Sequence, residues 1–77
     1  MDELLIETAM KAIRDYLRTR PDAADTVEGI HEWWITWPGE AEPLTITRAA
    51  LERLEAGGEL ERRRIGKREL WRARREG

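Results

Sequence analysis

Three of the four tryptophans in this chain fall within five positions, inside the stretch GIHEWWITWPGE (residues 29–40). The chain has 77 residues and no cysteine, so neither a disulfide nor a thiolate metal site can brace it. A core of this size is marginal, and each buried aromatic ring adds about 2–3 kcal/mol of stability. We therefore expect residues 1–77 to form one domain, with most of the tryptophan cluster in its core.

The residue types needed for catalysis and for membrane insertion are scarce. Serine is absent, which excludes a Ser-His-acid triad, and no glycine-rich phosphate loop is present. The single histidine, His31, has only Glu28 and Glu32 close by, on what we expect to be a solvated helix face. We expect no enzymatic activity, cofactor, metal site or small-molecule ligand. The acidic start of the chain and the lack of a long apolar run predict a cytoplasmic protein without membrane contact.

Basic residues gather toward the C-terminal end of a chain whose net charge is only −2. Residues 1–47 contain four basic and ten acidic residues, whereas residues 48–77 contain ten basic and six acidic ones. The contrast is sharper in residues 60–75, with eight basic and two acidic residues. Such asymmetry between the halves of a chain indicates an anionic partner.

Apolar spacing predicts two helices in the first half of the chain. The first covers about residues 2–20, because one face is apolar at i, i+3, i+4 and i+7 intervals and Pro21 stops the helix. The second covers about residues 25–35. It begins at Asp25, which together with Glu28 has the form of a capping box.

The tryptophans divide between this second helix and the loop after it. Trp33 and Trp34 both fit one broad apolar stripe, and we expect at least one of them to anchor the core. Trp37 lies beyond the helix end, directly before Pro38. Its ring could close the core as a lid or stand exposed as a protein contact, and the sequence leaves both open.

A third helix follows a short extended piece. Residues 43–46 are predicted to be extended, and Thr45 or Thr47 then caps a helix of about residues 47–57. Glycines at its end favour a left-handed stop. The inner face of this helix should consist of Thr47, Ala50, Leu51 and Leu54.

The last segment, about residues 59–74, reads as a β-hairpin around Gly66-Lys67, because glycine suits the first central position of a two-residue turn. A single basic helix is the competing interpretation, which the doubled glycine and the Ile65-Gly66 break disfavour. The hairpin register places Ile65 opposite Arg68, Arg63 opposite Leu70, Arg62 opposite Trp71 and Leu60 opposite Ala73. We expect the stem of Arg62 to lie along the Trp71 ring.

The order helix, helix, short strand, helix, hairpin resembles the winged helix-turn-helix family. The resemblance is carried by LTITRAALERLEAGGELERRRIGKRELWRARR, which looks like the third helix of that family followed by its wing, and it covers about residues 5–74. It implies an α+β, mainly helical fold: a three-helix winged helix-turn-helix with a short strand and a C-terminal β-hairpin wing. It also implies binding to double-stranded DNA, and with it a role in transcription regulation.

In that family the third helix commonly enters the major groove, and the wing contacts the minor groove or the backbone. By resemblance, the exposed positions of the third helix are Arg48, Glu52, Arg53 and Glu55. Arg48 and Arg53 would approach base edges. The wing residues that would contact DNA are Arg62, Arg63, Arg64, Lys67, Arg68 and Arg72.

A second hypothesis remains open. Two arginines alternate with two glutamates on the third helix, which also fits a solvated face held by i, i+4 ion pairs. The chain could then be a protein-interaction adapter of a larger complex, using the Trp37 loop and the basic wing toward a protein partner or a second copy of itself. Exposure of Trp37 together with a neighbouring tryptophan would favour this adapter.

Overall fold

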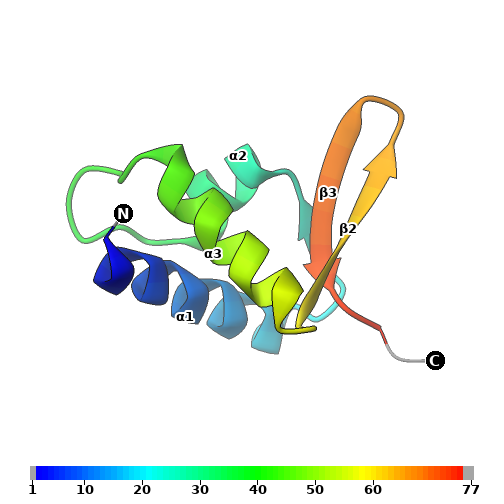
Figure 1. Cartoon of the computed structure of the whole chain (residues 1–77), viewed down its shortest axis with the longest axis horizontal. Helices are drawn as coiled ribbons and strands as arrows, with labels where there is room; N and C mark the ends of the chain where they lie inside the picture. Colours follow the sequence, from blue (N-terminus) through cyan, green and yellow to red (C-terminus); the bar gives the residue numbers. More distant parts are fainter. Residues whose placement is uncertain (1, 76–77) are drawn as a thin grey trace.

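A computed structural model describes residues 2–75, in which helices pack beside a three-stranded antiparallel sheet (Figure 1). The hairpin β2–β3 projects from one end of the helical part, as the yellow and orange arrows of Figure 1 show. The predicted α+β class is confirmed. The elements are α1 (Glu3–Thr19), β1 (Ala24–Asp25), α2 (Val27–Gly29), η1 (Ile30–Trp34), α3 (Leu44–Ala56), β2 (Leu60–Ile65) and β3 (Arg68–Ala73).

Helix α1 agrees closely with its prediction. The Asp2 carboxylate accepts a hydrogen bond from the Leu4 backbone N–H at 3.0 Å and so caps the helix. The helix ends before Arg20, directly ahead of Pro21. Its buried face consists of Ile6, Ala9, Met10 and Ile13.

The second helix begins at Val27, two residues later than predicted, and its cap is Thr26, one residue after the predicted Asp25. The Thr26 hydroxyl accepts from the Gly29 backbone N–H at 3.2 Å, whereas Asp25 lies in strand β1 opposite Trp71. Because Asp25 is held extended by its sheet partner, the capping role moves to its neighbour. The helix then widens, so that α2 continues into the π-helical segment η1.

The predicted extended piece at residues 43–46 is wrong. Helix α3 already begins at Leu44, and its N-cap position is Pro43, so neither Thr45 nor Thr47 caps it. Proline has a fixed φ that is compatible with a helix start, and it needs no partner for an N–H. The short strand instead lies before the second helix, at Ala24–Asp25. The predicted inner face of this helix is confirmed, since Thr47, Ala50, Leu51 and Leu54 are all buried.

The hairpin forms in the predicted register. Arg62 pairs with Trp71, and Ile65 pairs with Arg68 around a turn in which Gly66 has a φ of +62°. The Arg62 guanidinium lies 4.5 Å from the centre of the Trp71 ring, as expected from that register. Strand β3 is central in the sheet order β1-β3-β2, so it links the hairpin to the helices through β1.

The four tryptophans have different environments. Trp71 is fully buried, and Trp34 is buried with its ring stacked on Tyr16 at 4.5 Å, which confirms that one of the neighbouring pair anchors the core. Trp33 is 74% exposed and does not join the inner face. Trp37 is half-buried, and its indole N–H donates to the His31 carbonyl at 3.0 Å. It therefore closes over the core as a lid.

His31 does not lie on a solvated face. It is the second residue of η1 and is half-buried against α3, with Nδ1 2.6 Å from the buried Thr47 hydroxyl and its ring 5.2 Å from that of Trp37. His31 lies four residues after the buried Val27 and three before the buried Trp34, so the helical period itself places it on the inner face, whereas the predicted stripe ran through Trp33 instead. Within residues 2–75, no helix is long and apolar enough to cross a membrane.

Candidate nucleic-acid interface

Arg53 lies on the side of α3 that faces α1, away from the outer face. Its guanidinium donates to both carboxylate oxygens of Glu3, at 2.5 and 2.7 Å. This hydrogen-bonded arginine lowers the pKa of the Glu3 carboxyl below its ordinary value. These two hydrogen bonds join α1 to α3 and engage two of the three guanidinium nitrogens of Arg53, the residue that was predicted to approach a base edge.

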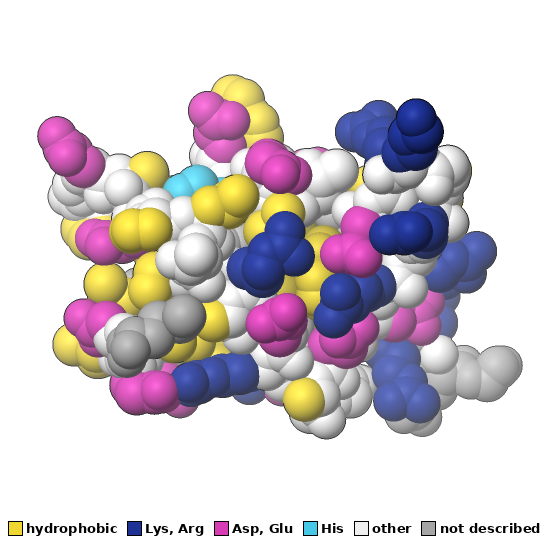
Figure 2. All heavy atoms as spheres, turned by 45° about the horizontal axis from the view of Figure 1, so that its top comes forward, with side chains coloured by type: hydrophobic (Ala, Val, Ile, Leu, Met, Phe, Trp, Pro, Cys, Tyr) yellow, Lys and Arg dark blue, Asp and Glu magenta, His cyan; other side chains and the backbone are white. Residues whose placement is uncertain are grey.

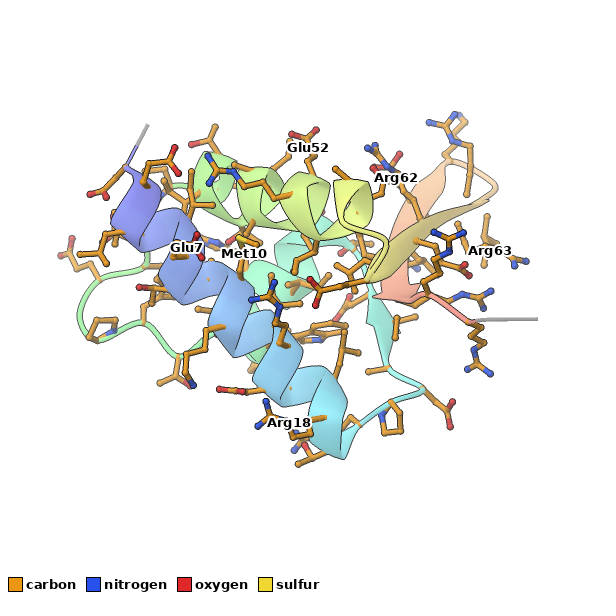
Figure 3. All side chains as sticks on the ribbon, turned by 60° about the horizontal axis from the view of Figure 1, so that its bottom comes forward. Glu7, Met10, Arg18, Glu52, Arg62 and Arg63 are labelled. Atoms are coloured by element: carbon orange, nitrogen blue, oxygen red, sulfur yellow. The ribbon has the colours of Figure 1, made fainter. Side chains whose placement is uncertain are left out.

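Arg62 joins the hairpin to the end of α3. It donates two hydrogen bonds of 2.8 Å to Glu55 and one of 3.5 Å to Glu69, while its plane lies over Trp71. The hydrogen bonds from Arg62 lower the pKa of Glu55. Figure 3 shows Arg62 between α3 and the hairpin, whereas Arg63 points away from α3. We infer that Arg62 positions the hairpin rather than contacting a ligand.

Arg72 is also engaged. Its guanidinium donates to Glu61 at 2.6 Å across the two strands, which the register places directly opposite each other. This bond lowers the pKa of Glu61. Arg72 is half-buried, so it too belongs to the hairpin framework.

The other predicted contacts are exposed, and none of them forms an ion pair within residues 2–75. We call these residues the open cations: Arg48, Arg63, Arg64, Lys67 and Arg68. Four of them lie toward the turn of the hairpin and one lies on α3. Figure 2 shows Lys and Arg side chains gathered at the hairpin end of the molecule, while acidic and hydrophobic side chains mix at the opposite end.

A hollow lies between α3 and the turn of the hairpin. It has a volume of about 460 Å³, and Arg48 lines it from α3 while Lys67 and Arg68 line it from the hairpin. Glu28 and Glu69 also line it, together with Thr26 and Val27 at the start of α2. We call this the α3–turn hollow. Arg48 and Lys67, which are 19 positions apart in the chain, thus line one hollow together with two carboxylates.

Fewer of the predicted residues lie on the outer face of α3 than the sequence indicated. Thr45, Arg48 and Glu52 are exposed on it, while Arg53 and Glu55 turn to either side and are held by Glu3 and Arg62. Arg48 and Glu52 are four positions apart, yet no ion pair joins them, nor any other two residues of α3, in the described part of the chain. The ion-paired solvated helix is therefore not what the structure contains.

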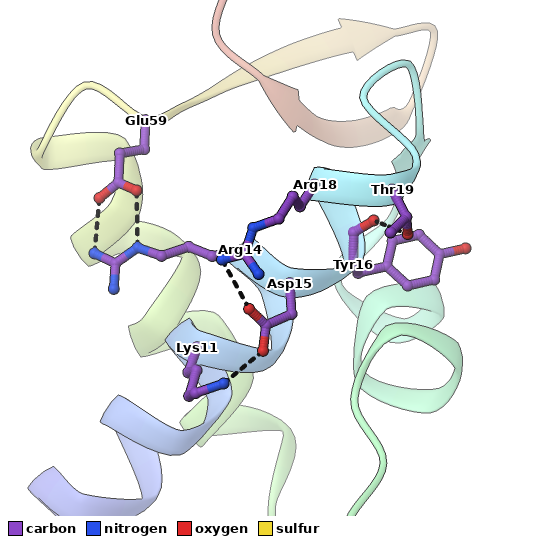
Figure 4. Close-up of polar contacts among 7 residues, drawn as sticks. All are labelled: Lys11, Arg14, Asp15, Tyr16, Arg18, Thr19 and Glu59. Carbon is purple, nitrogen blue, oxygen red and sulfur yellow. Dashed lines mark hydrogen bonds and ion pairs between the residues drawn. The ribbon is translucent and has the colours of Figure 1, made fainter.

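Several framework contacts were invisible to sequence reasoning. Arg14 of α1 donates two hydrogen bonds of 2.8 Å to Glu59, between α3 and β2, as Figure 4 shows. Their spacing in the chain follows no helical or strand period, so nothing marked the pair in advance.

Comparisons with known proteins give no relative from which to transfer a role. No protein-family model matches the chain, and no curated protein or solved structure matches it either. Among the described residues, no three His, Asp or Glu side chains gather as ligands of a metal ion would. The open cations are thus the feature on which a function can be argued.

Proposed function

We propose that the chain is a winged-helix module that binds double-stranded DNA and serves transcription regulation without catalytic activity of its own. One observation carries the proposal: Arg48 of α3 and Lys67 and Arg68 of the hairpin line the same hollow with no acidic partner of their own within residues 2–75. Phosphate oxygens are the ligands that such arginine and lysine side chains favour.

The arrangement of elements supports the winged-helix assignment. Three helical segments precede a hairpin, and a glycine pair separates α3 from β2. The small strand stands before α2 rather than before α3, which departs from the order on which the resemblance was drawn, but α3 is still followed directly by the hairpin. The outer face of α3 and the turn of the hairpin would then approach one duplex together.

The paired arginines give this surface its rigidity. Arg62 ties β2 to Glu55 of α3, and Arg72 ties β3 to Glu61, so the turn is held on a braced stem. A major groove about 12 Å wide admits a helix. With α3 in that groove, Arg48 faces base edges, and the cations near the turn face the sugar-phosphate backbone.

The test is fluorescence anisotropy of a labelled random duplex at about 50 and 200 mM salt. The variant replaces Arg64, Lys67 and Arg68 with alanine. Since each neutralised phosphate contributes about 0.9 to the slope of log affinity against log salt, we expect that slope to fall by about 3. The matched control replaces Lys11, Arg18 and Arg20, which removes the same charge from α1 and its end.

We expect the control to bind as the wild type does, because α1 lies away from the proposed surface. If the control weakens binding equally, net charge alone is responsible and the assigned surface is wrong. Absence of binding by the folded wild-type protein at about 50 mM salt would contradict the proposal as a whole.

One observation favours a second candidate, the protein-interaction adapter. Trp37, its predicted contact, is occupied as a lid, but Trp33 is 74% exposed on η1 beside the exposed Glu32. An exposed tryptophan is a common anchor of protein interfaces. Sedimentation over a concentration series tests the homodimer form: a dimer that disappears on Trp33→Ala would support the adapter, and a monomer at all concentrations would oppose that form.

A further inference from the structure

Glu52 is an unusual residue for a surface that meets DNA. It is exposed on the outer face of α3, and Figure 3 shows it pointing away from the body of the molecule. Within residues 44–73, the other carboxylates have arginine partners: Glu55 and Glu69 with Arg62, Glu59 with Arg14, and Glu61 with Arg72. Glu52 has no cationic partner among residues 2–75.

Arg48 lies one helical turn before Glu52 and does not neutralise it. On a helix, an acidic residue four positions before a basic one forms a better ion pair than the reverse order. Here the basic residue comes first, so the order is the less favourable one. The two side chains therefore stand next to each other with their hydrogen-bonding groups unused. One presents a planar fork of donors, and the other presents two acceptor oxygens.

A carboxylate near DNA is repelled by phosphates unless it meets a donor on a base. In the major groove the donors are the amino groups of cytosine N4 and adenine N6. Adenine places the N7 acceptor beside its amino group, which repels a carboxylate, whereas cytosine presents its amino group without that neighbour. The arginine fork matches the O6 and N7 acceptors of guanine. The two side chains are thus chemically suited to the two bases of G·C pairs.

We infer that Arg48 and Glu52 determine sequence specificity, with Arg48 donating to guanine and Glu52 accepting from cytosine in the major groove. The inference rests on the DNA-binding function proposed above and names the sequences that this surface selects. Side chains four apart on a helix have Cβ atoms about 5–6 Å apart. Successive bases of a strand rise by about 3.4 Å. The guanine and the cytosine therefore lie on neighbouring base pairs or one step further apart.

The experiment is selection from a pool of duplexes with a randomised central segment, followed by anisotropy titration of the enriched sequences. The wild type should enrich a guanine and a cytosine at this spacing. Glu52→Ala should lower the preference for that cytosine roughly tenfold or more. It should also bind unselected DNA more tightly, because a repelling carboxylate is gone. Arg48→Lys, which keeps the charge but loses the planar fork, should weaken the guanine preference.

The matched control is Glu40→Ala, which removes an exposed carboxylate from the loop before α3. It should leave both the preferred sequence and the affinity unchanged. Circular dichroism melts of all variants verify that they fold, which is expected because each replaced side chain is exposed.

The outcomes separate the inference from the function beneath it. A wild type that binds duplexes without enriching any sequence would overturn the inference and leave DNA binding intact. The same holds if Glu52→Ala strengthens binding to all sequences equally and keeps the wild-type preference. A wild type that binds no duplex would overturn the proposed function, and the inference with it.

Discussion

The stem and the turn of the hairpin use the same residue type in opposite ways. In the stem (residues 60–62 and 71–73) Trp71 is fully buried, and Arg62 and Arg72 are held by glutamates. In the turn region (residues 63–70) Ile65 is 61% exposed and the cations have no ion-pair partner within residues 2–75. The environment of an arginine, more than its presence, decides whether it braces the fold or remains available to a ligand.

This difference means that a count of basic residues overstates the proposed binding surface. Of the predicted contacts, Arg53, Arg62 and Arg72 already have carboxylate partners. If one of these arginines bound a phosphate instead of its glutamate, the protein would lose one internal ion pair for each phosphate contact that it gained. The open cations carry no such penalty, so the stem should respond to substitution through stability and the turn through binding.

The largest effect that separates stem from turn should come from Trp71→Ala. The ring is fully buried against the core, so its removal leaves a cavity and should lower the free energy of unfolding by about 3–5 kcal/mol. Ile65→Ala in the turn should change it by less than about 0.5 kcal/mol, because that side chain is mostly exposed. Urea unfolding followed by circular dichroism measures both. Comparable losses would remove the distinction between the two regions.

The sequence predicted the parts of the fold that local patterns determine. Helix α1, the inner face of α3 and the hairpin register followed from apolar periods and from the glycine turn. Strand β1 was missed because its two residues have no period of their own and are defined only by pairing with β3. The burial of His31 was missed for a different reason, because the predicted apolar stripe was drawn through Trp33, although the same period places His31 four residues after Val27 and three before Trp34.

A smaller effect on the stem should follow from Gly29→Ala. Strand β1 joins the stem through Asp25, and a Cβ on Gly29 would lie 2.1 Å from the Asp25 carboxylate oxygen Oδ1. The carboxylate must move or the contact must open, at a cost of about 1–3 kcal/mol. Gly39→Ala is the control, because no atom lies within 4 Å of the added methyl.

Urea unfolding of the two glycine variants measures this difference. Gly39→Ala should stay within about 0.5 kcal/mol of the wild type. Equal stability of both variants would mean that β1 and α2 do not approach each other closely enough to brace the stem.

Arg62→Ala should cost less still. Its ion pair with Glu55 is about one third exposed and its contact with Trp71 is partly solvated, so we expect a loss of about 1–2 kcal/mol. Arg63→Ala, one residue along the same strand, should change stability by less than about 0.5 kcal/mol. A double-mutant cycle with Glu55→Ala isolates the ion pair. A coupling free energy between Arg62 and Glu55 indistinguishable from zero would contradict the bracing role of Arg62 and group it with the open cations.

The candidate site was predictable only in outline. The basic composition of the hairpin located the surface, and the register led to the Arg62–Trp71 contact. Which arginines remain open could not be read from the sequence, because Glu3 and Arg53 meet only when α1 packs on α3. Partners so distant in the chain leave no periodic signal.

The smallest expected effect is on the pH dependence of stability, and it again distinguishes the stem from the turn. Hydrogen bonds from arginine lower the pKa of Glu55, Glu59 and Glu61 below the ordinary value of 4.5. A lowered pKa in the folded state means that these pairs stabilise the protein above about pH 4.5, and that this stabilisation is lost as the pH falls through the folded-state values. Stability should therefore decline on acidification below about pH 4.5, modestly, because the groups are largely solvated and salt screens them.

The Arg62→Ala and Arg63→Ala variants test whether the ion pairs of the stem cause this loss of stability in acid. Arg62→Ala removes the partner that lowers the pKa of Glu55, so the pH dependence of its urea midpoint between about pH 5 and pH 3 should be shallower than that of the wild type. Arg63→Ala should change the slope less, because Arg63 forms no ion pair within residues 2–75 and lowers the pKa of Glu61 only through its charge. If both variants flatten the curve equally, the acid response reflects the overall charge of the hairpin rather than the bonds of its stem.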